Sequence, residues 1–336
     1  MTGAGRYAEL AAAVRSFKAG LLQRTQLERL LETGSLAETI SAVTGGRITS
    51  AERENLGPVE AYLTQRTFEL STRLASYAPQ DSRALISLFA KSFEFACVKA
   101  ILSASAARET ADEAMRHIIS VGRFTGDRCK DLIEAHNLTR VVEAIDDEGL
   151  RRFLAPKLTG EAAGLQTVSA IDQYFFTQLW AASNLPDPLD AQAARGLIGE
   201  AIDHVNILTT FRAKLMGLDA RTAFGMMVQV NYGLGQAFNE LPEANSPQSV
   251  TRILEKTRYS NLFDTGTLDA ARMEYILNRS HAKTCENAFA GSPFNVGLAL
   301  AFLFLKNYEL RDLFGVINAK ANNVPAERVL ESLVLH

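Results

Sequence analysis

Apolar residues recur along the chain with a period close to 3.6 residues, and alternating β-branched runs between tight turns are absent. This pattern predicts an all-α fold. Between residues 203 and 215, four apolar side chains fall within about a third of the helix circumference, so that face should pack while the other stays polar; they are Val205, Leu208, Phe211 and Leu215. Most prolines lie between the periodic stretches: Pro58, Pro79, Pro186, Pro188, Pro242, Pro247 and Pro293.

Several helix boundaries can be read directly from the sequence. Ser35 with Glu38 three residues later forms a capping-box pattern, and Ser246 followed by proline predicts another helix start. Gly217 has the position of a glycine that ends a helix, and Asp219 then caps the next one.

The chain also repeats itself. A shift of 109 positions aligns residues 94–105 with 203–214, and a shift of 106 aligns 203–214 with 309–320. The second and third of these segments share an acid first, Asn or Asp at the fourth place and a lysine last, and the first begins with an acid. Near the start, residues 31–40 resemble 133–142 with an offset of 102. Chance similarity between amphipathic helices is the alternative explanation.

We expect three similar helical domains related by approximate threefold symmetry. Their bounds are 1–90, 91–200 and 201–336, with the option that the C-terminal helices complete the first one. Each is too small to bury a core alone, so the copies should pack side by side. Closure around an axis would make a funnel with a central cavity, whereas stacking would make a solenoid.

Composition narrows the classes of function. The 336 residues are 47% hydrophobic with a formal net charge of −3. This composition is typical of a folded chain, and its net charge would not attract nucleic acid.

The longest apolar run, 296–305, is about half of the ~20 residues that a membrane span needs. The cysteines do not form a C-x-x-C pair, and we interpret them as small buried hydrophobes in a reducing compartment: Cys97, Cys129 and Cys285.

Patterns typical of catalysis are weak or missing. The sequence has no phosphate-binding loop, and the glycines at 233 and 235 fit a turn between helices better than a dinucleotide site. Residues 146–148 resemble the acidic pairs of all-α prenyl-transferring enzymes, but a second pair does not follow, which favours a solvated helix start. The histidines lack zinc-ligand spacing, and His204 is predicted to be a surface or satisfied interface residue. We therefore expect no catalytic, metal or cofactor site.

Several weak elements in the right order carry a family resemblance. They are residues 7–22, 32–38, 203–217, 257–259, 292–320 and 324–334. The chain resembles the family of C subunits of archaeal and bacterial A/V-type ATPases, whose eukaryotic relative is the d subunit of the V-ATPase. The middle repeat departs from this pattern, since Cys97 stands where the third repeat has Asn206.

The resemblance implies a non-catalytic rotor adaptor in the central stalk of an A-type ATP synthase or V-type ATPase. Such an adaptor is peripheral on the cytoplasmic face, sits on the membrane ring of c/K-type proteolipid subunits and receives the D/F-type central shaft in its cavity. It would transmit torque during rotation that is driven by ATP or by ion flow, and so take part in the ion or proton transport of the complex. We expect a monomer when the chain is isolated, with neither a nucleic-acid partner nor a membrane span of its own.

Two surfaces are candidates for binding. The first would face the ring through Phe224, Met226, Met227 and Val230, with core packing as the alternative. The second would face the shaft or lie between repeats, and its members are Asp203, Asn206, Arg212, Lys214, Arg311 and Lys320. Ordinary capping and solvated helix ends are the alternatives for this second set.

Two other classes of function stay open. An all-α scaffold protein of the TPR or HEAT type would need a period of about 34 to 47 residues, which the sequence lacks. A magnesium-dependent isoprenoid-type enzyme would need a polar pocket with paired carboxylates.

Overall fold

The computed structural model describes residues 3–32, 34–51, 55–158, 163–263 and 269–335. Every regular element assigned within these ranges is helical, and the only β pairing there is an isolated bridge between Val121 and Phe124. The prediction of an all-α fold is confirmed.

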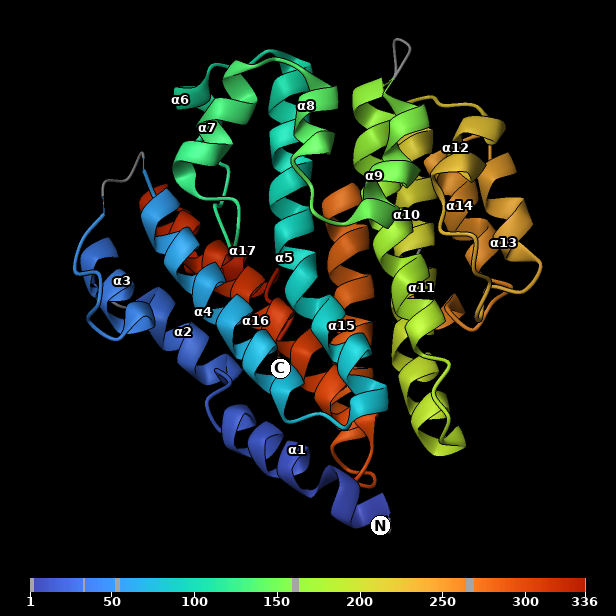
Figure 1. Cartoon of the computed structure of the whole chain (residues 1–336), viewed down its shortest axis with the longest axis horizontal. Helices are drawn as coiled ribbons and strands as arrows, with labels where there is room; N and C mark the ends of the chain where they lie inside the picture. Colours follow the sequence, from blue (N-terminus) through green and yellow to red (C-terminus); the bar gives the residue numbers. More distant parts are fainter. Residues whose placement is uncertain (1–2, 33, 52–54, 159–162, 264–268, 336) are drawn as a thin grey trace.

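The framework consists of long helices in consecutive pairs (Figure 1). In the described ranges, those of 19 to 28 residues are α4 (Gly57–Ser76), α5 (Gln80–Ala107), α10 (Ala163–Ala182), α11 (Pro188–Leu215), α15 (Ala270–Ala288) and α16 (Val296–Ala321). Each contacts the next in this order, and α16 contacts α4 again. The contacts between the long helices therefore close on themselves, and α16 also contacts α5 and α11 across this circuit.

Shorter helices gather in separate groups beside this framework, as Figure 1 shows. Helices α2 (Arg24–Glu32) and α3 (Leu36–Thr44) pack on α16, and α2 also contacts α17 (Ala326–Leu330). A second group follows α5: α6 (Ala111–Ala114), α7 (Gly126–Glu134), α8 (Leu138–Glu143), α9 (Glu148–Leu154) and the 3-10 turn η1 (Ala155–Lys157). A third follows α11: α12 (Ala220–Met226), α13 (Ala237–Glu240), η2 (Leu241–Glu243), α14 (Pro247–Leu254) and η3 (Ser260–Leu262).

Helix α16 explains the longest apolar run of the sequence. Every residue from Val296 to Leu305 is buried, because α16 contacts α1 (Gly3–Lys18), α4, α5, α11 and α15 as well as short helices. A helix surrounded by other helices needs apolar side chains on all sides. None of the described helices is both long enough and apolar enough to span a membrane.

The predicted helix boundaries are confirmed at four caps. Ser35 and Glu38 form a complete capping box, and Ser246 caps α14 by accepting from the Ser249 amide. Asp219 caps α12, and Gly217 beyond the end of α11 has φ of +70°, the left-handed conformation that glycine adopts without strain.

The predicted packing face of residues 203–215 is confirmed at Phe211, which is buried, but it is wrong at Leu215 and in expecting the polar side to stay exposed. Leu215 is 52% exposed and Leu208 is only half-buried, whereas Asp203, Asn206 and Thr210 are fully buried. The reason lies in the tertiary structure: the polar side of α11 is covered by the irregular segment 227–235, whose backbone it binds.

Candidate functional site: a buried polar network and the predicted surfaces

Asn206 binds the backbone of the segment that follows α12. Its Oδ1 accepts a hydrogen bond from the Val228 amide at 2.8 Å, and its Nδ2 donates to the Val228 and Val230 carbonyls at 3.0 and 3.3 Å. The segment has no regular structure that could satisfy these groups, so a buried side-chain amide replaces a neighbouring strand or helix turn.

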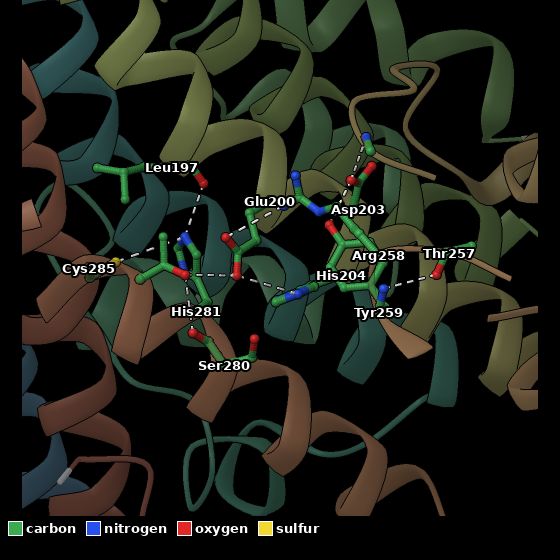
Figure 2. A network of polar contacts seen from close by, with 12 residues as sticks. Leu197, Glu200, Asp203, His204, Thr257, Arg258, Tyr259, Ser280, His281 and Cys285 are labelled. Atoms are coloured by element: carbon green, nitrogen blue, oxygen red, sulfur yellow. Dashed lines mark hydrogen bonds and ion pairs between the residues drawn. The ribbon is translucent and has the colours of Figure 1, made fainter. Parts of the chain in front are cut away.

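Asp203, one helix turn earlier, holds the next part of the same segment (Figure 2). Its carboxylate accepts from the Gly233 amide at 2.8 Å, the Tyr232 amide at 3.4 Å and the Tyr259 hydroxyl at 2.7 Å. Burial raises the pKa of Asp203, although these donors favour its ionised form. Asp203 and Asn206 thus act together, as hydrogen-bond anchors of the segment that follows α12.

Glu200 is the charged centre of the network between α11 and α15. Its Oε1 accepts from the Thr284 hydroxyl at 3.2 Å, and its Oε2 lies 3.6 Å from Nη2 of Arg258. Burial raises the pKa of Glu200 as well. The pair links α11 to the loop after α14, and most of the Glu200 side chain is shielded from water.

The two buried histidines of the network differ in whether their ring nitrogens have hydrogen-bond partners. His281 Nε2 donates to the Leu197 carbonyl at 3.0 Å, which leaves Nδ1 to accept from the Tyr308 hydroxyl at 2.8 Å. His204 is also buried, and its Nε2 has no hydrogen-bond partner in the described part of the chain; the nearest Glu200 oxygen is 3.9 Å away. The prediction that His204 is a surface or satisfied histidine is therefore wrong.

Close approach of backbone and aromatic rings completes the network. The Tyr232 ring lies against Gly199, and the Arg258 guanidinium lies 5.0 Å above the centre of that ring. The described residues contain no group of three or more His, Cys, Asp or Glu side chains that could hold a metal ion. The network fastens segment 227–262 to α11 and α15.

Sequence reasoning found Asp203 and Asn206 but missed the role of Glu200, Tyr259 and His281. The acid at the first place of each aligned segment points to Asp203 and not to these three residues. Glu94 accepts from the Arg123 amide at 3.2 Å, and Glu309 from the Leu22 amide at 2.7 Å. These acids, like Asp203, bind a backbone amide of an adjoining segment.

The fourth position of the aligned segment 309–320 behaves similarly. The Asp312 carboxylate accepts from the Val334 amide at 3.0 Å and from the Leu335 amide at 2.9 Å, as Asn206 accepts from Val228. Position 97, the corresponding place in the middle copy, is the buried thiol of Cys97. The shared residue types noted in the sequence therefore have a shared structural use.

The acidic cluster at residues 146–148 has structural partners. Asp147 caps α9 by accepting from the Leu150 amide, and it also accepts from Tyr174 and pairs with Lys91. Asp146 pairs with Arg123. The prediction of a helix start is confirmed, and these contacts occupy the carboxylates that a prenyl-transferring enzyme would present to magnesium.

The predicted ring-facing residues differ in how far they are exposed. Phe224 is 37% exposed, and Met226 and Val230 are half-buried. Met227 is fully buried in a core to which α11, α13, α14 and α15 contribute, so including it in an exposed surface was wrong. The physical reason is that α12 ends at Met226, after which the extended chain turns inward and Gln173 donates to the Met227 carbonyl at 2.9 Å.

Two of the predicted basic residues share one acidic partner. Arg212 of α11 and Arg311 of α16 both bind Glu274 of α15, at 2.6 and 3.1 Å. Lys214 instead donates to the Leu218 carbonyl at 3.3 Å. Lys320 lies near the end of α16, beside a hollow of about 330 Å³.

The fold and the network define an all-helical protein in which buried polar side chains fasten irregular backbone to long helices. The model of the ATP synthase (C/AC39) subunit family matches residues 10–332, and the chain belongs to this family. The chain is 23% identical to the C subunit of the A-type ATP synthase of Methanocaldococcus jannaschii, covering 98% of this chain and 86% of the relative. It is 24% identical to the corresponding C subunits of Methanobrevibacter smithii and Methanosphaera stadtmanae, over 98% and 96% of this chain and 88% and 86% of theirs.

Proposed function

We propose that the protein is a non-catalytic rotor adaptor in the central stalk of an A/V-type ATPase. The observation that carries this proposal is the family match along nearly the whole chain, together with relatives named as the C subunit of the A-type ATP synthase. In this role the protein links the central shaft to the proteolipid ring on the cytoplasmic face of the membrane and transmits torque in either direction of rotation.

The proposal includes three equivalent helical units around a central cavity. It is supported by the closed circuit of long-helix contacts, the separate groups of short helices and the recurring acid-to-amide bonds. The caps of α3, α8 and α14 also recur: Ser35, Asn137 and Ser246 each accept from the amide three residues later. In this arrangement α2 and α3 complete the C-terminal unit, since they pack on α16 and α17.

Two different surfaces, both near the C-terminal end of α11, would then have different partners. We assign the shaft to the surface that includes Arg212 and Arg311, where the cluster around Glu274 joins three long helices. We assign the ring to the exposed side of α12, where Phe224 stands beside the half-buried Met226. An isolated chain would be a monomer, because its partners in this role are other subunits.

Co-purification with the proteolipid ring tests this function. Phe224→Glu should lower ring binding about tenfold or more, because a charge would replace an exposed aromatic contact. Leu189→Glu is the matched control: Leu189 is 72% exposed near the opposite end of α11, and the variant should bind as the wild type does.

The ring-binding experiment tests the position of the ring contact as well as the proposed function. Unchanged binding by Phe224→Glu, with loss in Leu189→Glu, would move the ring contact to the other end of the molecule. No binding of either shaft or ring by the folded wild-type chain would contradict the adaptor function and favour an independent helical scaffold.

A further inference from the structure

Cys97 and Cys129 form a buried thiol pair between α5 and α7. Their Sγ atoms are 3.8 Å apart, and the residues are 3% and 0% exposed. Cys285 lies apart on α15, where its Sγ is 3.9 Å from Nε2 of His281. The pair therefore joins a long helix to the short helices that follow it.

The alignment of the repeated segments indicates what this thiol pair could replace. Cys97 occupies the position of Asn206 and Asp312, which anchor the adjoining segments of the other copies by hydrogen bonds to backbone amides. A thiol is a weak hydrogen-bonding group and a poor substitute for such an anchor. A second thiol within reach offers a covalent alternative.

We propose that Cys97 and Cys129 are a reversible disulfide site, oxidised by a peroxide and reduced by a dithiol, that fastens α7 to α5. Disulfide formation needs the two sulfurs to approach from 3.8 Å to about 2.05 Å, a movement of less than about 2 Å. Helix α7 has only nine residues and follows the irregular turn at 121–125, so a small shift of this helix can supply the approach.

A small oxidant has a route to Cys97. Cys97 lines a hollow of about 400 Å³ between α4, α5 and α16, where its neighbours on α5 include the small side chains of Ala96 and Ala100. Hydrogen peroxide is little larger than water and fits such a space. Cys285 does not line this hollow.

The reaction is balanced with peroxide as the oxidant. One cysteine sulfur, as thiolate, attacks a peroxide oxygen and the O–O bond breaks, which leaves a sulfenic acid and a hydroxide that takes up the released proton as water. The second sulfur attacks the sulfenic sulfur, the S–S bond forms, the S–O bond breaks and a second water leaves. Two thiols together lose two electrons to one peroxide, and two exchange steps with a dithiol reverse the change.

The disulfide would close a loop from residue 97 to residue 129 and restrict the unfolded chain accordingly. The full-length protein should therefore melt several degrees higher after oxidation than after reduction. An oxidised sample with a proven 97–129 bond and no gain in melting temperature would contradict the role as a fastening between helices.

Peptide mapping tests the bond directly. After treatment of the folded full-length chain with stoichiometric hydrogen peroxide, free thiols are alkylated and the protein is digested with trypsin without reductant. Cleavage after Lys91, Lys99, Arg128 and Lys130 should yield peptide 92–99 joined to peptide 129–130, lighter by two hydrogen atoms than the separate peptides and split by dithiothreitol.

Serine variants supply the controls. Cys97→Ser and Cys129→Ser should each abolish the linked peptide, whereas Cys285→Ser should retain it at the wild-type yield. Oxidation of the wild type that stops at separate sulfenic or sulfinic acids, a bond that involves Cys285, or full retention of the thiols in the folded chain would overturn the proposal. Because the wild-type map is decisive without the variants, poor folding of a serine variant does not weaken the test.

Discussion

At the scale of single residues, Gly199 shows how closely segment 227–235 approaches α11. A Cβ built at this position would lie 2.3 Å from Cγ of the Tyr232 ring, whereas one at Gly196 would meet only the Tyr232 hydroxyl, at 4.0 Å. The two glycines lie almost one turn apart on the same helix and face the same tyrosine, so they form a matched pair.

Gly199→Ala should destabilise the protein by about 1–3 kcal/mol, because the Tyr232 ring must leave its place. Gly196→Ala should be neutral or stabilising by up to about 1 kcal/mol, since alanine is the better helix former and the space is open. Urea unfolding of both variants measures the difference. Equal stability of the two would show that the ring can move without cost.

His281 makes stability depend on pH. Burial lowers the pKa of His281 from 6.5 to about 4, so the folded state holds this imidazole neutral where the unfolded chain protonates it. The stabilisation is present above pH 6.5 and is lost as the pH falls toward 4. By linkage, His281 should contribute a loss of about 2 kcal/mol between pH 7 and pH 5.

The comparison with His281→Gln isolates this contribution. Burial raises the pKa values of Glu200 and Asp203, and raised carboxyl pKa values act in the opposite direction, so the wild type alone reports only a sum. Chemical unfolding at both pH values should show a drop in stability that is larger by about 2 kcal/mol in the wild type than in the variant. An equal drop in both would refute the assignment.

At the scale of elements, the chain between α12 and α15 depends on side chains of α11 for its position. Its described part, residues 227–263, contains only short helices and irregular backbone, and Asp203 with Asn206 supplies hydrogen bonds that this secondary structure lacks. Such a segment should open locally when its anchors are removed.

Asp203→Ala should therefore destabilise the protein by about 3 kcal/mol and speed amide hydrogen exchange between residues 227 and 262. Tyr259→Phe removes one of the donors and leaves the two backbone bonds, so about 1 kcal/mol is expected. Exchange that rises equally throughout the described chain in Asp203→Ala would show global rather than local loosening.

At the scale of the whole molecule, helices from the N-terminal and C-terminal parts of the chain pack together. Glu309 of α16 binds the Leu22 amide, α17 contacts α2, and the Asp312 carboxylate holds the amides at 334 and 335. The N-terminal helices α2 and α3 therefore depend on the C-terminal segment more than on their neighbours in sequence.

Truncation after Ala321 tests this dependence. The shortened chain lacks the buried side chains of Val329, Leu333, Val334 and Leu335, so amide exchange should accelerate across α2 and α3. Helices α13 and α14 serve as the internal control and should keep their protection. Unchanged exchange in α2 and α3 would show that these helices are held by α16 alone.

The sequence by itself determined the all-α class and the caps at Ser35, Asp219 and Ser246, because these follow from local periodicity and local hydrogen bonds. Only the tertiary structure decided which side of a helix is buried. Asp203 and Asn206 lie inside because a distant backbone segment supplies their partners, and Met227 lies inside because the chain turns after α12. Burial of a polar group depends on donors and acceptors far away in sequence, which periodicity does not encode.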